Sequence, residues 1–517
     1  PRSTPIKSSA ASDVYKRQLL GIAALFACSD DNTEPPVPAP VEPDKATIEL
    51  DVTNVQLPRS GGSAEVTVTA NYDDWDFKNT ESWLSVQKSG NKLIFSANEN
   101  TTSERNTATV AVTVLGEGEE NTASATINVV QNDASLIIEI KLDRDGLTMV
   151  APVLGMLECT IDWGDGKTEP LTGNIDGVFS FQPTHFYEKS GTYQIRIYGF
   201  MPRIGIGSPF TDVELAYITS VIQWGNTGLT SMQNALKGCV NLTSIPSDTD
   251  GSFTNVTTFS NAFYGCTSLR EIPADLFVNC DKVETFSFCF DDAGLESIPA
   301  GLFDNCIATE TFASVFSGCP LISIPDELFV KCVSAKTFSS VFFGCQFLQS
   351  IPENLFKGCE KAEAFTYAFR QCPSLTEIPE GLFSPCPLAK DFAGLFTMCY
   401  SLASIPEGLF ANNPKAENFN YSFTECTSLT EIPAGLFDSN RAVKSFQATF
   451  RNCIRLSSET PYTTIEGKKV HLYERSKYPG QFIAPSTYEY CFSNCTELMD
   501  YEYMQQNYPD WSKPYLR

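Results

Sequence analysis

Residues 423–433 read Phe-Thr-Glu-Cys-Thr-Ser-Leu-Thr-Glu-Ile-Pro, and variants of this stretch recur through the second half of the chain. Its closing Ile-Pro pair occurs eight times, at steps of 26 or 27 residues. The isoleucines are Ile245, Ile272, Ile298, Ile324, Ile351, Ile378, Ile405 and Ile432. A repeat of this length predicts a solenoid in which each unit forms one coil and stacks on the next, and we expect about nine coils. Such an array favours binding through an extended surface over chemistry in a pocket.

Apolar side chains return at fixed positions of the repeat. A side chain at one coil position packs on its copies above and below, so we expect these columns to form the core. The first column is Phe259, Phe286, Phe312, Phe338, Phe365, Phe392, Phe419 and Phe446. A second column begins at Phe263, a third at Phe277, and a leucine column at Leu269. Short strands are expected at the Leu-x-x-Ile and Ala/Val-x-x-Phe segments, with tight turns between them.

Cysteine also forms two columns. The first is Cys239, Cys266, Cys319, Cys345, Cys372, Cys399, Cys426 and Cys453, and the spacing places Asp292 in its empty slot. The second is Cys280, Cys306, Cys332, Cys359 and Cys386, continued by Asn413 and Asn440. Disulfides are one interpretation, because an exported chain meets an oxidising compartment. The columns lose cysteine in different coils, so we favour buried free thiols, and the pattern favours no metal site.

The stretches Thr427-Ser-Leu-Thr-Glu-Ile-Pro433 and Phe423-Thr-Glu-Cys426 resemble the BspA-like leucine-rich repeats of bacterial surface proteins, over roughly residues 217–500. The resemblance implies a surface-displayed interaction protein, often an adhesin. The units here are longer than the usual form of that repeat.

The first residues resemble an export signal. A short apolar run, Leu19 to Ala27, follows Lys16 and Arg17 and ends at Cys28. This looks like a lipoprotein signal over residues 1–28, with Cys28 as the lipidated residue, and a linker follows over 29–45. Residues 1 to about 15 read like a cloning scar. The acidic residues after Cys28 are similar to the surface-export signal of Bacteroidetes lipoproteins, so we expect a lipid anchor in the outer membrane.

Residues 46–132 alternate as β-strands do and predict a small Ig-like β-sandwich. Their motifs, from Gly61-Gly62-Ser63 to Val129-Val-Gln131, resemble a BACON domain, a family associated with carbohydrate-active surface proteins and glycan binding. Trp75 and Trp83 are therefore candidate sugar-binding residues, although tryptophan on a short strand favours a core role.

Residues 135–200 predict a second Ig-like β-sandwich, similar to a PKD-type domain, with Ile161-Asp-Trp-Gly-Asp-Gly166 as its mark. Asp162 and Asp165 raise the possibility of a calcium loop. Gly-Asp-Gly is a favoured hairpin turn, so we favour turn geometry.

The solenoid is expected over residues 201–456, followed by an insertion, a last coil and a cap over 457–517. Residues 457–487 hold Lys468, Lys469, Arg475 and Lys477, which predict a basic patch. The aromatic tail supplies the candidate ligand-binding residues Tyr488, Tyr490, Tyr501, Tyr503, Tyr508 and Trp511. A recognition platform is one interpretation, and a cap over the last coil is the favoured one.

A net charge of −26 argues against nucleic acid as a partner. The sequence has no motif of a common catalytic site, so we expect no enzyme, no catalytic residues and no cofactor. The prediction is a mainly β, monomeric surface lipoprotein that binds a host or community protein or glycan through its solenoid. Alternatives are glycan capture by the BACON-like domain and a purely structural spacer.

Overall fold

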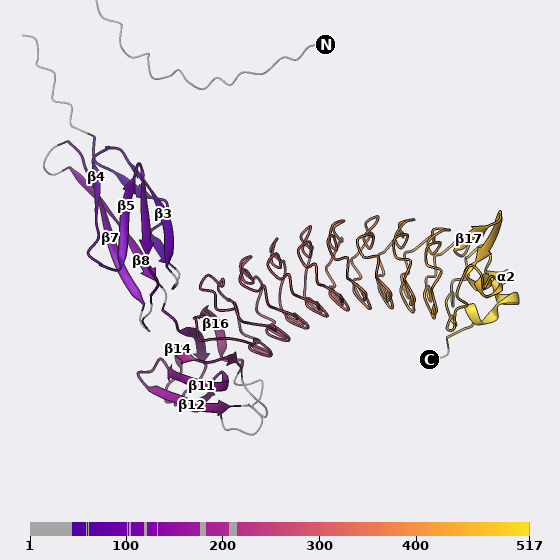
Figure 1. Cartoon of the computed structure of the whole chain (residues 1–517), viewed down its shortest axis with the longest axis horizontal. Coiled ribbons are helices and arrows are strands. Elements are labelled where there is room, and N and C mark those ends of the chain that lie inside the picture. The colour runs from indigo at the N-terminus through magenta and orange to yellow at the C-terminus, as the bar shows by residue number, and fades with distance from the viewer. Residues whose placement is uncertain are drawn as a thin grey trace, which may run out of the picture.

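The computed structural model describes residues 44–57, 59, 61–100, 102, 105–117, 121–131, 133–175, 182–205 and 215–515. The apolar run before Cys28, and Cys28 itself, lie outside these residues. The chain is mainly β, as predicted, with 27% of the described residues in strands and 4% in helices. Two strand-rich domains lead into an arched array of coils that ends in a compact C-terminal region (Figure 1). Within the described residues, no helix has the length and apolar character needed to cross a membrane.

The first domain holds two four-stranded sheets around one core. One sheet has the order β1 (Ile48–Leu50), β3 (Gly62–Ala70), β6 (Lys92–Ala97), β5 (Leu84–Ser89). The other has the order β2 (Asn54–Leu57), β8 (Thr122–Gln131), β7 (Asn106–Leu115), β4 (Trp75–Lys78). Alternate residues such as Val66, Phe95 and Val112 are buried between the sheets, which matches the alternation of the sequence. This core is separate from that of the rest of the chain.

The second domain is built on a six-stranded sheet. Its strands run β12 (Thr168–Ile175), β11 (Val153–Asp162), β14 (Gly191–Phe200), β9 (Leu136–Leu142), β16 (Ile218–Gln223), with β15 (Arg203–Ile204) paired to β11. A two-stranded sheet joins β10 (Leu147–Val150) to β13 (Thr184–Tyr187). The edge strand β16 lies beyond residue 200, where we expected the domain to end, and it pairs antiparallel with β9.

Strand β16 also starts the solenoid. Ser220 in β16 forms a parallel bridge with Ser244 in the first coil. Trp224 follows the strand, packs on Phe253 at 5.0 Å and donates its indole N–H to the carbonyl of Pro246 at 2.8 Å. One cluster of buried side chains runs from Leu136 to Trp511. The second domain therefore caps the N-terminal end of the coils.

The phenylalanine columns form the interior of the coils, as predicted. Phe365 stacks on Phe338 and on Phe392, each at 5.7 Å between ring centroids. Rings of the third column, Phe356 and Phe383, meet Phe365 edge-on at 4.9 Å. The three columns are fully or almost fully buried from Phe259 to Phe450. Each coil therefore covers the rings of its neighbours, which a single coil could not do alone.

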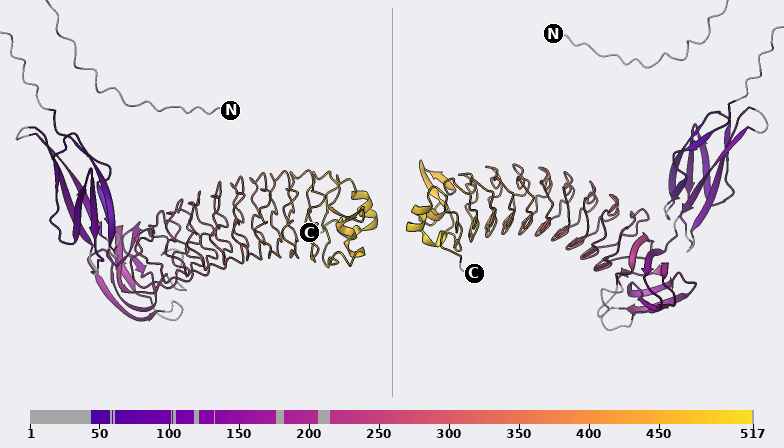
Figure 2. Two further views of the ribbon diagram at one scale, coloured as in Figure 1. Left: turned by 45° about the horizontal axis from the view of Figure 1, so that its top comes forward. Right: turned by 180° about the vertical axis from the view of Figure 1, so that it is seen from behind.

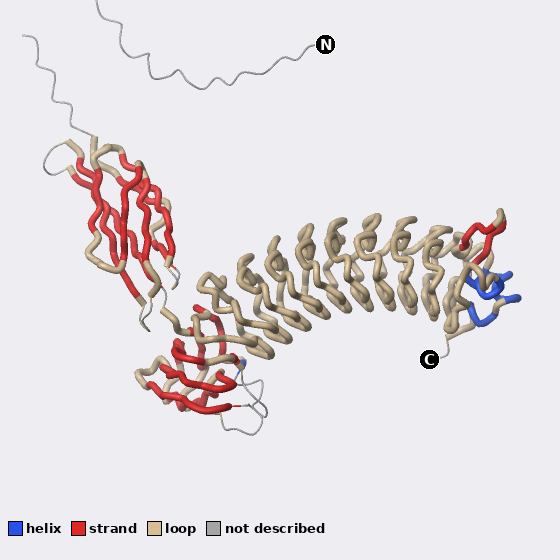
Figure 3. Tube along the Cα trace, in the orientation of Figure 1, coloured by secondary structure: helices blue, strands red, loops and turns tan. Residues whose placement is uncertain are grey.

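The expected strands of the coils are reduced to single residues, and the coils are drawn as loops in Figure 3. Parallel bridges occur just before the first phenylalanine column, as between Thr337 and Ala364. From Phe259 to Leu456 no bridge forms on the Leu-x-x-Ile side, so the prediction of strands there is wrong. Proline after each isoleucine has no N–H to donate, which prevents a continuous ladder on that side.

The cysteine columns are free thiols, as predicted, and all seventeen cysteines in the described residues are buried. The first column donates its S–H groups to carbonyls of the preceding coil, as Cys372 does to Phe342 at 3.2 Å. In the second column Cys359 contacts the Phe329 carbonyl at 3.5 Å, and Asn413 donates to the equivalent Phe383 carbonyl at 2.9 Å. Both side chains supply a small donor to the same acceptor, which explains why asparagine replaces cysteine here.

Our placement of Asp292 in the empty cysteine slot is wrong. The buried residue at this coil position is Ala293, three residues after Phe290. Its N–H donates to the Phe290 carbonyl at 3.0 Å, as the Cys266 N–H donates to the Phe263 carbonyl. The coil is one residue shorter after this point and turns through Gly294. A Cβ on Gly294 would lie 2.2 Å from the Thr267 carbonyl oxygen, so only glycine fits.

Candidate functional site: the C-terminal cap

The C-terminal cap, residues 457–486 and 499–515, closes the end of the solenoid farthest from the first two domains (Figures 1 and 2). Its elements are β17 (Tyr462–Ile465), β18 (Lys468–His471), η1 (Leu472–Lys477), α2 (Tyr501–Asn507) and η2 (Pro509–Trp511). A last coil, residues 487–498, lies between the two parts, and its Phe492 stacks on Phe450 at 5.6 Å. This arrangement of insertion and resumed coil is the one expected from the sequence.

The cap supplies the hydrogen-bond partners that a further coil would supply. Tyr490 and Phe492 donate their N–H groups to the carbonyls of Asp510 and Trp511, at 3.0 and 2.8 Å. The Trp511 side chain is 4% exposed and packs against Phe446 and Phe492. Trp511 therefore covers the end of the core.

Arg475 has the same capping role on the other side of the coil. Its guanidinium donates to the carbonyls of Phe437 at 2.7 Å and Asn440 at 3.1 Å. In the coil before, Asn440 donates to the equivalent carbonyls of Phe410 and Asn413. Arg475 is fully buried, and burial lowers its pKa to about 9. It is not part of a surface patch, so our interpretation of the four basic residues as one patch is wrong.

Two of the other three basic residues of the insertion are paired. Lys469 forms an ion pair with Glu459, and Lys477 with Glu474. Exposed pairs of this kind contribute little to stability, but their carboxylates offset the charge of Lys469 and Lys477.

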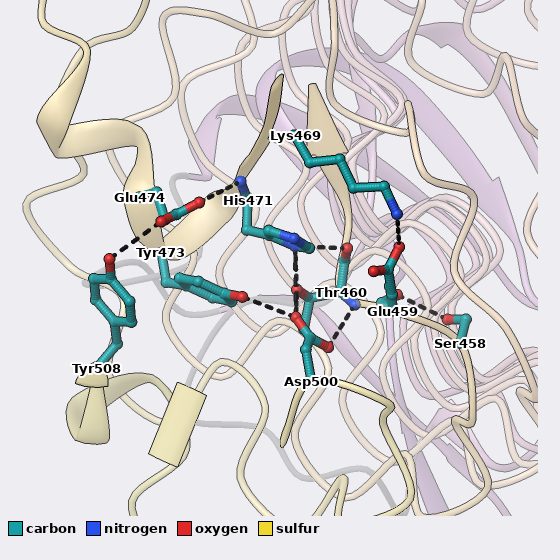
Figure 4. Close-up of polar contacts among 9 residues, drawn as sticks. All are labelled: Ser458, Glu459, Thr460, Lys469, His471, Tyr473, Glu474, Asp500 and Tyr508. Carbon is teal, nitrogen blue, oxygen red and sulfur yellow. Dashed lines mark hydrogen bonds and ion pairs between the residues drawn. The ribbon is translucent and has the colours of Figure 1, made fainter. Parts of the chain in front are cut away.

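A polar cluster fastens the insertion to α2 (Figure 4). Asp500 accepts hydrogen bonds from the Thr460 N–H at 3.0 Å, the Thr460 hydroxyl at 2.5 Å and the Tyr473 hydroxyl at 2.9 Å. His471 lies 3.5 Å from the same carboxylate and stacks on the Tyr473 ring at 5.1 Å. Burial, and then the Asp500 charge, raise the pKa of Tyr473, so the hydroxyl stays protonated and donates. The cluster positions Tyr473 beside the cavity described next.

An aromatic cavity of about 340 Å³ opens between η1, α2 and η2. Four rings line it, those of Tyr473, Tyr488, Tyr508 and Trp511, and Tyr488 stacks on Trp511 at 4.9 Å. Its other lining residues are Leu472, Ser476, Pro485, Asn507, Pro509 and Asp510. Flat rings with a few polar groups suit a small ligand or one unit of a larger ligand.

The cavity unites only part of the predicted site. Tyr488, Tyr508 and Trp511 line it, whereas Tyr501 packs against the core and Tyr503, 52% exposed, is not among its lining residues. Tyr490 is absent from the lining and meets Tyr515 edge-on at 5.0 Å. Sequence reasoning missed Tyr473, which lies in the insertion that we interpreted through its lysines.

Trp75 and Trp83 lie in the first domain, away from the cap (Figure 1). Trp75 is 7% exposed, and Lys88 lies 3.8 Å over its ring and bonds to its carbonyl. Trp83 is half-buried and packs against the same core. Neither ring is presented as an open sugar platform.

The Asp162–Asp165 segment is a turn. Asp162 accepts the Gly164 N–H at 2.9 Å and Asp165 accepts the Lys167 N–H at 3.1 Å, while His185 contacts Asp165 at 2.9 Å. The carboxylates therefore serve the backbone of the turn. Across the described ranges, no group of three or more His, Cys, Asp or Glu side chains is arranged to hold a metal ion.

Comparison with protein families agrees with the geometry of the coils and of the first domain. The BspA type leucine rich repeat region matches in six copies, over residues 216–307 and 270–417. The viral BACON domain matches residues 44–130. The chain is a BspA-like leucine-rich repeat protein with a BACON domain. BspA-like repeat proteins are cell-surface proteins.

Among solved structures, the BspA-like chain is similar to a leucine-rich cell surface protein from Faecalibacterium prausnitzii, at 18% identity. The similarity covers 54% of this chain and 88% of the other, with a TM-score of 0.15. No curated protein matches the chain.

Proposed function

We propose that this BspA-like protein is a non-enzymatic cell-surface binding protein that engages a host or community macromolecule through its solenoid and C-terminal cap. One observation carries the proposal: a single core runs from Leu136 to Trp511, so the second domain, the coils and the cap form one continuous body. Such a body holds side chains of distant coils at fixed spacing, and a pre-organised surface loses less conformational entropy on binding.

The remaining expectations fit this proposal. A lipid on Cys28 in the outer membrane would place the first domain near the cell and the aromatic cavity at the far end of the solenoid. The second domain would act as a PKD-like stalk and would also cap the first coil. The protein would act as a monomer.

Glycan capture by the BACON domain is the second candidate, and it rests on the family match. The burial of Trp75 disfavours it, because a sugar needs an open ring face. A spacer role would leave the aromatic cavity of the cap without a function.

Two fragments separate these candidates. The cut belongs near residue 132, because the first domain has its own core, whereas a cut at residue 200 would remove β16 from its sheet. Fragments 44–131 and 133–517 would be tested for binding to immobilised mucin and to the same mucin stripped of its glycans. We expect fragment 133–517 to carry the binding. Mucin binding confined to fragment 44–131 would show that the BACON domain, and not the solenoid, binds the ligand.

A further inference from the structure

Each coil contains a left-handed residue two positions after the first phenylalanine column. Its φ lies between +52° and +64° in nine successive coils. The occupants are Asn261, Phe288, Ser314, Ser340, Tyr367, Gly394, Tyr421, Ala448 and Tyr490. Glycine and asparagine tolerate this backbone conformation best, and bulky residues rarely adopt it.

Three of the last five coils nevertheless place tyrosine there. A large side chain at positive φ is unfavourable for folding, and such outliers concentrate at functional sites. Gly394, which occupies this position in the coil between those of Tyr367 and Tyr421, has no side chain. A Cβ on Gly394 would lie 2.2 Å from the Tyr367 ring, so the ring occupies the space above this coil.

The tyrosines belong to one surface strip, which we call the tyrosine row: Tyr367, Tyr421, Tyr490 and Tyr515, with Arg370 and Arg451. Tyr490 meets Tyr515 at 5.0 Å, and Arg451 lies 4.3 Å over the Tyr515 ring. Burial raises the pKa of Tyr421, and the hydroxyls of Tyr515, Tyr367 and Tyr490 act on it in the same direction while Arg451 opposes them. Tyr421 lies two coils from Tyr367 and two coils from Tyr490 at the same coil position, so these residues share one face of the solenoid.

The guanidinium of Arg370 supplies the row with hydrogen-bond donors for a ligand. Its guanidinium lies between two rings, 5.1 Å from Tyr367 and 5.7 Å from Phe343. Among the described residues it has no ion pair, and its Nε is buried without a partner. Arg451, in contrast, is paired with Glu425 at 3.3 Å. A half-buried guanidinium held by rings loses little entropy when it binds a ligand oxygen.

The backbone of the row cannot pair with a peptide strand. Tyr367 and Tyr421 donate their N–H groups to Ala393 and Gln447, and their carbonyls accept from Arg370 and Thr424. A peptide added as a strand needs a free edge of N–H and C=O groups, and this strip has none. Only ring faces, hydroxyls and the guanidinium remain for a ligand.

We propose that the tyrosine row binds a linear, neutral glycan chain, whose sugar rings stack on Tyr367 and Tyr421 while Arg370 donates to its hydroxyl oxygens. Because its tyrosines hold the same position in alternate coils, the row follows the solenoid axis, which suits a linear polymer better than a globular protein interface of roughly 800 Å² per partner. The net charge of −26 favours an uncharged ligand over an acidic one. This inference rests on the proposed binding function and names a surface and a ligand class for it.

The test uses residues 44–517 and three probes: hexasaccharides of β-1,4-glucan, of β-1,4-mannan and of poly-N-acetyllactosamine. Binding is measured by calorimetry for the wild type and for Tyr421→Ala, Arg370→Ala and Phe288→Ala. Ala448 occupies the same left-handed position, so alanine at 421 is compatible with the coil. Phe288→Ala is the matched control, because Phe288 is an exposed aromatic residue at the same coil position outside the row.

We expect at least one probe to bind the wild type, and Tyr421→Ala and Arg370→Ala to weaken it about tenfold or more. Phe288→Ala should bind as the wild type does, and all variants should melt within a few degrees of it. If no probe binds, or if the control loses as much affinity as Tyr421→Ala, the inference is wrong. Mucin binding by fragment 133–517 that survives Tyr421→Ala would overturn the row while leaving the proposed function intact.

Discussion

Substituting Phe365 by alanine tests the stacked interior quantitatively. Phe365 is 0% exposed, stacks on two rings of its own column and meets two rings of the third column at their edges. Removing a buried phenylalanine costs about 3–5 kcal/mol, and each aromatic pair contributes about 0.5–1.5 kcal/mol beyond its buried area. We therefore expect a loss near the upper end, about 5 kcal/mol.

The loss should be local, because coils of a solenoid interact mainly with their neighbours. Native-state hydrogen exchange resolves it: amides of the coils holding Phe338, Phe365 and Phe392 should lose protection, and those near Phe259 should not. Phe288→Ala is the control, since Phe288 is 41% exposed and should cost under about 1 kcal/mol. Equal protection in the two variants would refute the assignment of the column to the interior.

Three further predictions address particular residues. Asn413→Cys should change the unfolding free energy by less than about 1 kcal/mol, because a thiol can donate to the same Phe383 carbonyl. Asn413→Ala removes the donor and should lower the unfolding free energy by about 1–3 kcal/mol. Denaturant titration of the two variants measures both values. Arg475→Ala should lower the unfolding free energy by about 3 kcal/mol, because two buried carbonyls lose their donor. Hydrogen exchange should then become faster in residues 457–486 before the rest of the solenoid. Unchanged exchange in these residues would contradict the capping role. Burial raises the pKa of Asp291 to about 6, so the folded state binds more protons than the unfolded state between about pH 4 and pH 6, and stability should fall as pH rises through that window. Allowing for solvent screening, the unfolding free energy should fall by about 1 kcal/mol across this window. Thermal melts at several pH values should show that Asp291→Asn removes this pH dependence. A pH profile identical to that of the wild type would show that Asp291 is not the titrating group.

The sequence predicts the coils well because each buried ring recurs at a visible interval. Phe365 has seven equivalents in its column, so periodicity alone assigns it to the interior. The same periodicity misled us at Asp292, because the shorter coil shifts the register by one residue and only the burial of Ala293 reveals it.

The site is predicted less completely, and the reason is physical. Composition identifies Tyr488, Tyr508 and Trp511 as candidates, but the path of the insertion brings Tyr473 beside them and buries Arg475. The left-handed backbone beneath Tyr421 could not be inferred from that residue. The occurrence of Asn261 and Gly394 at the same coil position is the one signal of it in the sequence.

Counting reactive thiols tests the central claim, a continuous dry interior, most directly. A protein of residues 44–517 would be treated with an alkylating reagent at pH 8, once in its native state and once after denaturation without reductant. Mass spectrometry would then give the number of labels on each sample. Burial raises the pKa of these thiols, to about 12 for Cys399, so we expect no label on the native protein. We expect seventeen labels after denaturation, one for each buried cysteine. Rapid labelling of the native protein, or sulfurs that react only after reduction, would contradict the account.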